Sequence, residues 1–135
     1  MTVYLLDTSA LLTLRDDEPG AERVGDLLEQ VQLGTVRCFG SFMSLMEVLY
    51  RVWRDEGEAA GRLAYEQCLA LPVVWLHETP ELLKRAAAIK AHHPLSVADA
   101  WIAASAIEQG AILIHKDPEF KVVPVLQEPL PWKDQ

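Results

Sequence analysis

Short apolar runs alternate with longer stretches of helical periodicity along the chain, and this alternation limits the folds available to it. The apolar runs fall at residues 3–6, 36–39, 72–76, 111–114 and 122–125, and each has the length of a β-strand. The runs are largely unbroken by polar residues, so both faces of the strands are expected to be buried. Strands of this kind occur in parallel sheets covered by helices on both sides.

Helix signals fill the stretches between the apolar runs. Helical segments are predicted at residues 10–14, 21–32, 42–55, 58–69, 80–91 and 96–109. Pro80 suits a first helical turn, Gly110 suits a C-cap, and Pro19 with Gly20 marks a turn. We therefore predict an α/β protein with three layers (α/β/α) around a central, mostly parallel five-stranded sheet. The length of 135 residues predicts a single domain over residues 1–135.

The acidic composition restricts the partners of the chain. The net charge is −8 at neutral pH, whereas proteins that bind nucleic acid usually present a basic surface to the phosphates. A site that gathers acids around divalent cations is an exception, because the bound cations reverse the local sign of the charge. The acidity also suits a basic protein partner.

Several features predict a cytoplasmic protein. No apolar run reaches the ~18 residues of a membrane-spanning helix. The first residues carry no basic region and reach Asp7 at once, which differs from a signal peptide. Cys38 and Cys68 lie too far apart for a metal-binding pair and are predicted to be reduced, partly buried thiols.

Acidic side chains occur where the predicted sheet would present a ligand site. Asp7 directly follows the first strand, and Asp117 follows the fourth strand by a few residues. The carboxyl ends of parallel strands lie at one edge of a sheet, which is where such folds bind ligands. Asp99 lies near the start of a helix with no charged residue from 100 to 107, so it is a charge at the end of a buried helix. Grouped carboxylates suit Mg²⁺ or Mn²⁺.

Each acid also has an ordinary structural interpretation. Asp7 suits an N-cap, and Asp117 suits a turn that begins before a proline. Asp99 suits a capping box with Ser96. Glu47 falls near the polar edge of its helix, where an ion pair with Arg51 one turn later is the simpler interpretation. Glu119 is a fifth acid nearby, with surface exposure as the alternative.

Four segments resemble the successive acidic motifs of PIN-domain proteins. The segments are residues 6–12 (LDTSALL), 44–49 (SLMEVL), 95–103 (LSVADAWIA) and 114–120 (IHKDPEF). Their order and spacing fit the family, and the resemblance extends over almost the whole chain. In size the chain is similar to VapC-type toxins, the ribonuclease halves of toxin–antitoxin pairs. One such motif is unspecific, but four in order are a specific signal.

The resemblance implies a Rossmann-like sheet and the endonucleolytic hydrolysis of RNA with one or two Mg²⁺ or Mn²⁺ ions. It assigns both the catalytic and the metal-binding roles to Asp7, Glu47, Asp99 and Asp117. The polar edge that carries Glu47 would then be the rim of the active site rather than plain surface. Such ions activate water for attack on a phosphodiester, which leaves 5′-phosphate and 3′-hydroxyl ends.

Two further expectations concern the surroundings of these acids. Thr8 or Ser9 would support Asp7 through a hydroxyl or backbone contact. The family often has Thr or Ser two positions before the fourth acid, where this chain has His115. How Asp117 is positioned, and whether it meets metal directly or through water, therefore stays open.

The resemblance also implies partners. A cognate antitoxin would cover a groove next to the site, and a homodimer is expected. Candidate groove residues are Leu11, Leu14, Leu49, Tyr50 and Trp53, although Leu49 and Trp53 suit a core position better. Candidate contacts to RNA phosphates, each with plain surface charge as the alternative, are Arg15, Arg51, Arg54 and Lys116.

Other functions remain open from the sequence. A metal-independent ribonuclease would use histidines as general acid and base, and the chain offers His77, His92, His93 and His115. A binding module that keeps the fold without catalysis is the alternative outside the enzymes. An aspartyl phosphotransferase would need a second acid just after Asp7, and a dinucleotide fold would need a glycine-rich turn there; residues 8–10 are Thr-Ser-Ala.

Overall fold

The computed structural model describes residues 1–132 and has a five-stranded, fully parallel sheet at its centre. The strands are β1 (Thr2–Leu6), β2 (Val36–Ser41), β3 (Val74–Leu76), β4 (Ile112–His115) and β5 (Gln127–Pro129). Their order across the sheet is β3-β2-β1-β4-β5, and every neighbouring pair is parallel. The predicted parallel sheet is therefore confirmed.

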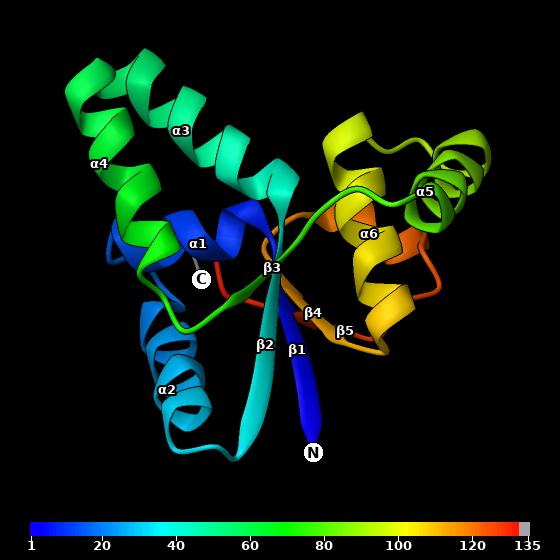
Figure 1. Cartoon of the computed structure of the whole chain (residues 1–135), viewed down its shortest axis with the longest axis horizontal. Coiled ribbons are helices and arrows are strands. Elements are labelled where there is room, and N and C mark those ends of the chain that lie inside the picture. The colour runs from blue at the N-terminus through cyan, green and yellow to red at the C-terminus, as the bar shows by residue number, and fades with distance from the viewer. Residues whose placement is uncertain (133–135) are drawn as a thin grey trace.

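Helices cover both faces of this sheet (Figure 1). One layer contains α1 (Thr8–Arg15), α2 (Ala21–Gln32), α3 (Phe42–Glu56) and α4 (Glu58–Leu69). The other contains α5 (Pro80–His92) and α6 (Val97–Gln109), and a short 3₁₀ helix, η1 (Pro118–Val122), follows β4. None of the helices described here has the length and apolar character required to span a membrane.

Neighbouring residues of the strands point into two separate hydrophobic cores. Leu5 and Leu113 pack with α5 and α6, whereas Leu6 and Ile114 pack with the layer of α1 to α4. All four side chains are fully buried. Because successive side chains of a strand point to opposite faces, a run of apolar residues fills both cores at once. This confirms the three-layer α/β/α architecture.

The last strand is not where the sequence pattern places it. Residues 122–125 are predicted to be a strand, but Val122 ends η1 and residues 123–125 form an irregular connection. The last strand, β5, is instead the polar segment Gln127–Pro129. Val123 is buried in the core without pairing, and Pro124 has no N–H to give to a sheet. Polar residues are tolerated in β5 because it is an edge strand, where Glu128 forms an ion pair with Arg23.

The strand order places a ligand site beside β1. The chain runs outward from β1 through β2 to β3, then crosses back to form β4 on the other side of β1. Crossovers from β1 and β4 thus leave in different directions at the carboxyl ends of these strands. This is the position at which open α/β sheets bind ligands, and Asp7 follows β1 directly.

Two helical glycines provide a test of how tightly α3 and α4 are packed. A Cβ at Gly61 in α4 would lie 2.7 Å from the carbonyl oxygen of Leu49 and 2.9 Å from the backbone nitrogen of Trp53, both in α3. A Cβ at Gly25 in α2 would meet nothing within 4 Å. Gly61→Ala should therefore lower the free energy of unfolding by about 1–3 kcal/mol, because the two helices must separate.

Gly25→Ala is the matched control, since it has the same gain in helix propensity without the clash. It should raise the free energy of unfolding by roughly 0.5–1 kcal/mol. Urea unfolding of both variants followed by circular dichroism measures the difference. A Gly61→Ala protein as stable as the Gly25→Ala protein would contradict the close packing of α3 against α4.

Candidate functional site

Asp7 stands at the end of β1 and is the N-cap of α1. Its Oδ1 accepts a hydrogen bond from the backbone N–H of Ala10 (2.8 Å), and its backbone N–H donates to the carbonyl of Ile114 in β4 (3.1 Å). Ser9 Oγ lies 2.7 and 2.9 Å from the two carboxylate oxygens and donates to them. The same hydroxyl accepts the backbone N–H of Lys116 (2.9 Å), so it joins the segments that follow β1 and β4.

Glu47 reaches the site from α3 and is buried, with 8% of its surface exposed. Its Oε1 accepts from the Thr8 hydroxyl (2.7 Å), and Thr8 Oγ1 also lies 2.9 Å from Ser44 Oγ. Its Oε2 accepts from Arg51 (3.1 Å). The ion pair with Arg51 that helix spacing suggests is therefore present, but it lies inside the site rather than on open surface.

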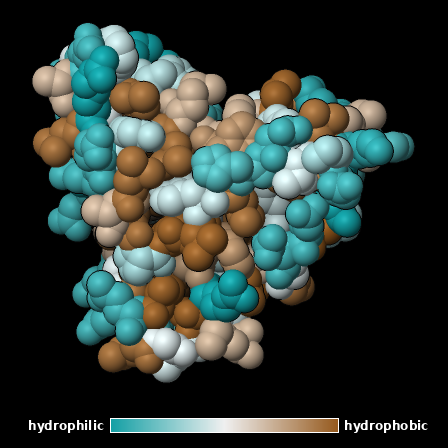
Figure 2. Space-filling model, in the orientation of Figure 1, coloured by the Kyte–Doolittle hydropathy of each residue, from teal (hydrophilic) through white to brown (hydrophobic). Residues whose placement is uncertain are grey.

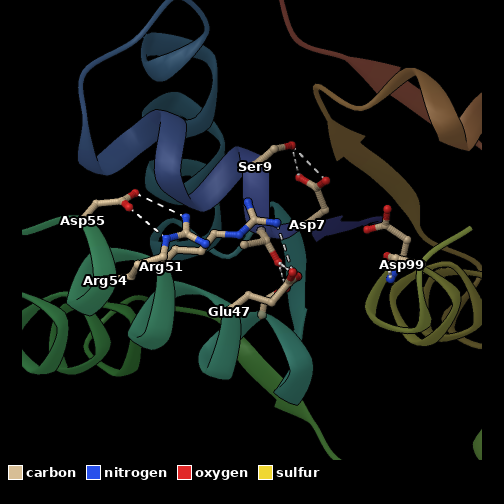
Figure 3. Close-up of polar contacts among 10 residues, drawn as sticks. Asp7, Ser9, Glu47, Arg51, Arg54, Asp55 and Asp99 are labelled. Carbon is tan, nitrogen blue, oxygen red and sulfur yellow. Dashed lines mark hydrogen bonds and ion pairs between the residues drawn. The ribbon is translucent and has the colours of Figure 1, made fainter.

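Asp99 faces Asp7 from the start of α6 (Figure 3). Ser96 is the N-cap of this helix, and its Oγ accepts the backbone N–H of Asp99 (3.1 Å). The carboxyl group of Asp99 lies close to that of Asp117, with carboxylate oxygens of the two residues within 4.8 Å of one another. The capping interpretation thus applies to the backbone of Asp99, whereas its side chain belongs to the acidic group.

Asp117 and Glu119 complete the group from the loop after β4. Asp117 is the N-cap of η1, where its Oδ1 accepts the backbone N–H of Glu119 (2.9 Å). Carboxylate oxygens of Asp99, Asp117 and Glu119 lie within 4.8 Å of one another. Glu119, considered only as a fifth acid from the sequence, therefore adjoins Asp99 and Asp117.

Burial and the charges of neighbouring acids make Asp7 and Asp99 difficult to ionise. Burial raises the pKa of Asp7 to about 7, hydrogen bonds from Ser9 and Ala10 oppose that rise, and the charges of Asp117 and Glu47 add to it. Burial, the contact with Asp117 and the charges of Asp7 and Glu47 raise the pKa of Asp99 to about 7 as well. The charges of neighbouring acids contribute to both shifts. Asp7, Glu47, Asp99 and Asp117 therefore form one electrostatic group, although they belong to different parts of the chain: the end of β1, α3, α6 and the start of η1.

A divalent cation fits this donor set. The group offers only carboxylate oxygens, which are the ligands of hard cations such as Mg²⁺ and Mn²⁺. A bound cation would lower the raised pKa values, because it favours the ionised form of each neighbouring acid. Asp7, Asp99, Asp117 and Glu119 can provide oxygens, whereas both oxygens of Glu47 are engaged with Thr8 and Arg51.

The basic residues considered for phosphate contacts are all paired with acids. Arg15 pairs with Glu56 and Asp16, and Arg54 pairs with Asp55 (Figure 3). Lys116 is buried, with its Nζ 3.6 Å from Glu18. Of these four, Arg51 is the one whose acidic partner, Glu47, belongs to the candidate site.

Sequence reasoning missed two residues that hold the acids in place. Ser44 lies one helical turn before Glu47 and contacts Thr8, a relation that helical spacing could have indicated. Gln127 binds the ring of His115 (2.9 Å) from β5, a segment predicted to lie outside any strand. Nothing in the local sequence signals this second contact. Ser9, one of the two hydroxyl residues expected beside Asp7, makes that contact, whereas Thr8 serves Glu47.

The sequence matches one protein-family profile. The profile is described as the PIN domain, and the match extends over residues 4–126. A comparison with curated proteins gave no match.

Solved structures of similar fold come from bacterial toxin–antitoxin systems. A chain of VapBC2 from Rickettsia felis, solved with a DNA fragment from the promoter, has a TM-score of 0.77 and 16% identity, with 96% of this chain and 100% of that chain covered. A chain of VapBC-1 from nontypeable Haemophilus influenzae has a TM-score of 0.72 and 23% identity (95% and 98% covered). VapC20 from Mycobacterium tuberculosis, described as a toxin that cleaves the sarcin–ricin loop, has a TM-score of 0.70 and 18% identity (93% and 97% covered).

Asp99→Asn should stabilise the metal-free protein at pH 8, because it removes one charge from a repelling group. A raised pKa means that the folded state holds its proton more tightly than the unfolded state. The tighter binding of this proton stabilises the folded state fully below about pH 4, and the stabilisation is lost as the pH rises through about 7. The variant does not titrate at this position and avoids the loss. We expect a gain on the order of 1 kcal/mol at pH 8, a value discounted for the partial exposure of Asp99.

Urea unfolding in the presence of a chelator, at several values between pH 4 and pH 8, measures this difference. The gain should shrink toward pH 4, where the wild-type acid is protonated in the folded state and about half protonated in the unfolded state. A variant that is less stable than the wild type at pH 8 would show that the Asp99 carboxylate supports the start of α6 instead.

Proposed function

Since the chain belongs to the PIN-domain family, we propose that it is a metal-dependent endoribonuclease, the toxin of a VapBC-type toxin–antitoxin pair. The observation that carries the proposal is the acidic group itself. Carboxylate oxygens of Asp99, Asp117 and Glu119 lie within 4.8 Å of one another, and the buried Asp7 and Glu47 adjoin them. Such repulsion persists in a folded protein when a ligand relieves it.

The proposed roles follow from the contacts of each side chain. Asp7, Asp99 and Asp117 serve as the oxygen donors for Mg²⁺ or Mn²⁺, while Ser9 keeps the Asp7 carboxylate in one orientation. When bound, the ion would activate water and stabilise the charge that develops on the scissile phosphodiester. Water attack leaves 5′-phosphate and 3′-hydroxyl ends.

Glu47 and Arg51 act together at the edge of the site in this proposal. In the metal-free protein Arg51 neutralises Glu47, and Thr8 orients the other carboxylate oxygen. An RNA phosphate that approaches the site offers Arg51 a second anionic partner. If Arg51 transfers to the phosphate, Glu47 is released to serve as the fourth metal ligand. This exchange couples the binding of RNA to the completion of the acid set.

The alternative histidine mechanism finds little support in the side-chain contacts. Both ring nitrogens of His115 are engaged, one by the backbone of Asp117 and one by Gln127. Nδ1 of His92 is engaged with the carbonyl of Ala88, and the His77 ring stacks on Phe42. No acid–base pair of histidines is formed among residues 1–132.

An antitoxin partner is part of the proposal. Toxin–antitoxin complexes are prominent among the solved structures with this fold. A cavity of about 240 Å³ lies between α1, α3 and α4, with Leu11 and Leu14 among its lining residues. Hydrophobic surface gathers over this part of the molecule in Figure 2. Tyr50 and Trp53 on α3 are 41% and 43% exposed, so the core position expected for Trp53 is wrong.

A homodimer is the second proposed assembly. Leu83 of α5 and Val97 of α6 are exposed, and they border an apolar groove together with Trp101. We propose this face as the contact between two copies. Analytical ultracentrifugation of the purified chain tests the assembly, and a strictly monomeric protein would contradict it.

RNA cleavage by the purified chain tests the enzymatic proposal. We expect cleavage with Mg²⁺ or Mn²⁺, none with excess chelator, and 5′-phosphate ends on the products. Asp99→Asn should reduce cleavage by more than the ~10–100-fold typical of residues that only orient a ligand. Asp26→Asn on the exposed surface of α2 is the matched control and should retain full activity.

The other outcomes separate the alternatives. Cleavage that persists with chelator and leaves 2′,3′-cyclic phosphates would favour the histidine mechanism. Binding of Mn²⁺ without cleavage of any RNA tested would favour a silent binding module.

Arg51→Met tests the exchange between Glu47 and RNA. Removing the Arg51 guanidinium should tighten Mn²⁺ binding, because this guanidinium no longer competes with the metal ion for Glu47. The KM for RNA should rise about tenfold, since a hydrogen bond to a charged group contributes ~1.5–3 kcal/mol. Arg54→Met, one turn away, with an ion pair to Asp55 and its guanidinium over the Tyr50 ring, is the control and should change neither value. Weaker Mn²⁺ binding by the Arg51 variant would contradict the exchange.

A further inference from the structure

The loop that carries Asp117 is fastened by two polar side chains, the buried His115 and the half-buried Gln127. His115 ends β4 and is 3% exposed. Gln127 begins β5 and lies 2.9 Å from Nε2 of the His115 ring. The loop between them contains η1, with Asp117 at its start. Both residues lie outside the acidic group, and neither has a role in the reaction described above.

The contacts of His115 fix which ring nitrogen carries the proton. The backbone N–H of Asp117 points at Nδ1 over 3.0 Å, and a backbone N–H can only donate, so Nδ1 is the acceptor. In a neutral imidazole the other nitrogen, Nε2, then carries the hydrogen. It donates to Oε1 of Gln127, whose carbonyl oxygen can only accept. The burial of the ring lowers the pKa of His115, which agrees with a neutral side chain.

Gln127 continues the connection into η1. Its Nε2 donates to the carbonyl of Phe120 (2.6 Å) and to that of Val123 (3.3 Å). The Phe120 ring packs on His115 with ring centres 4.9 Å apart, and Phe120 is fully buried. The two ends of the loop and its 3₁₀ turn are thus held by one network, which runs from the backbone of Asp117 through His115 and Gln127 to Val123.

This network orients Asp117 through its backbone. The Asp117 N–H is held by His115, and Oδ1 of Asp117 holds the N–H of Glu119. Neither His115 nor Gln127 bonds to a carboxylate of the acidic group. The acid is therefore aimed at Asp99 without the loss of a carboxylate oxygen to the residue that aims it.

We propose that His115 is the positioning residue for Asp117, and that it acts through Nδ1 as the acceptor of the Asp117 backbone N–H. The inference rests on the proposed metal-dependent function and adds to it the residue that sets the geometry of one ligand. Residues that orient metal ligands typically contribute ~10–100-fold to metal affinity.

Three substitutions test the contacts of the two His115 ring nitrogens separately. H115N keeps an acceptor oxygen at the distance of Nδ1 from Cβ, and it loses the contact with Gln127. H115Q extends its amide toward Gln127 and loses the acceptor near the Asp117 N–H. H115L keeps much of the buried volume and loses both contacts. Thermal unfolding of each variant, with chelator present, establishes that the protein is folded before any ligand is added.

Mn²⁺ affinity and the exchange rate of the Asp117 amide proton are the two measurements. H115N should bind Mn²⁺ within about threefold of the wild type, whereas H115Q and H115L should bind it ~10–100-fold more weakly. The Asp117 amide should exchange with solvent faster in H115Q and H115L than in H115N. In the wild type, ¹⁵N NMR should show His115 with an unprotonated Nδ1 and a protonated Nε2, which needs no variant.

Each remaining outcome decides the question. A wild-type chain that binds no Mn²⁺ overturns the proposed function and this inference with it. If the wild type binds Mn²⁺, then equal affinity in H115L and the wild type overturns the positioning role alone. Stronger Mn²⁺ binding by H115Q than by H115N, or a wild-type ring protonated at Nδ1, overturns it as well.

Discussion

Electrostatic repulsion among neighbouring carboxylates is the constraint on which the rest of the structure depends. Burial, together with the charges of neighbouring acids, raises the pKa values of Asp7 and Asp99 to about 7. Each acid comes from a different segment of the chain, and each segment is attached to the sheet or to a packed helix. The rigid scaffold holds together groups that would separate if they were free to move.

Hydroxyl groups hold the two acids of this group that lie nearest the start of the chain, Asp7 and Glu47. Ser9 donates to Asp7, and Thr8 donates to Glu47. A hydroxyl orients a carboxylate without adding a full positive charge, so the site keeps its attraction for a cation. Arg51 is the exception among the described contacts, and it lies on Glu47 at the edge of the site. The helix caps also hold the acids in place, because they fix the direction in which each helix that carries an acid leaves the preceding strand or loop.

Patterns that depend on local sequence predicted most of the fold. The helix bounds of α2 and α4 agree with their predicted ranges, and the apolar runs identify four of the five strands. The prediction of the fifth strand is wrong because Val123 fills the hydrophobic core without joining the sheet. Gln127 is polar, and the contact that holds it in place comes from the folded chain rather than from its local sequence.

The positions of Asp7 and Asp117 could be predicted from the topology of a parallel sheet. Glu47 needed the family resemblance, since helical spacing alone favoured a surface ion pair. The effect of His115 depends on Gln127 and could not be inferred from neighbouring residues.

The dependence of the Asp117 loop on Gln127 has a consequence for the newly made chain. During synthesis a protein emerges with its N-terminal part first and folds as segments become available. Asp7, Glu47 and Asp99 reach the outside of the ribosome before the segment that fastens Asp117, because β5 begins at Gln127. A nascent chain therefore carries an incomplete acid set until that segment emerges. For a nuclease made beside ribosomal RNA, the order of the elements along the chain would delay activity until β5 has emerged.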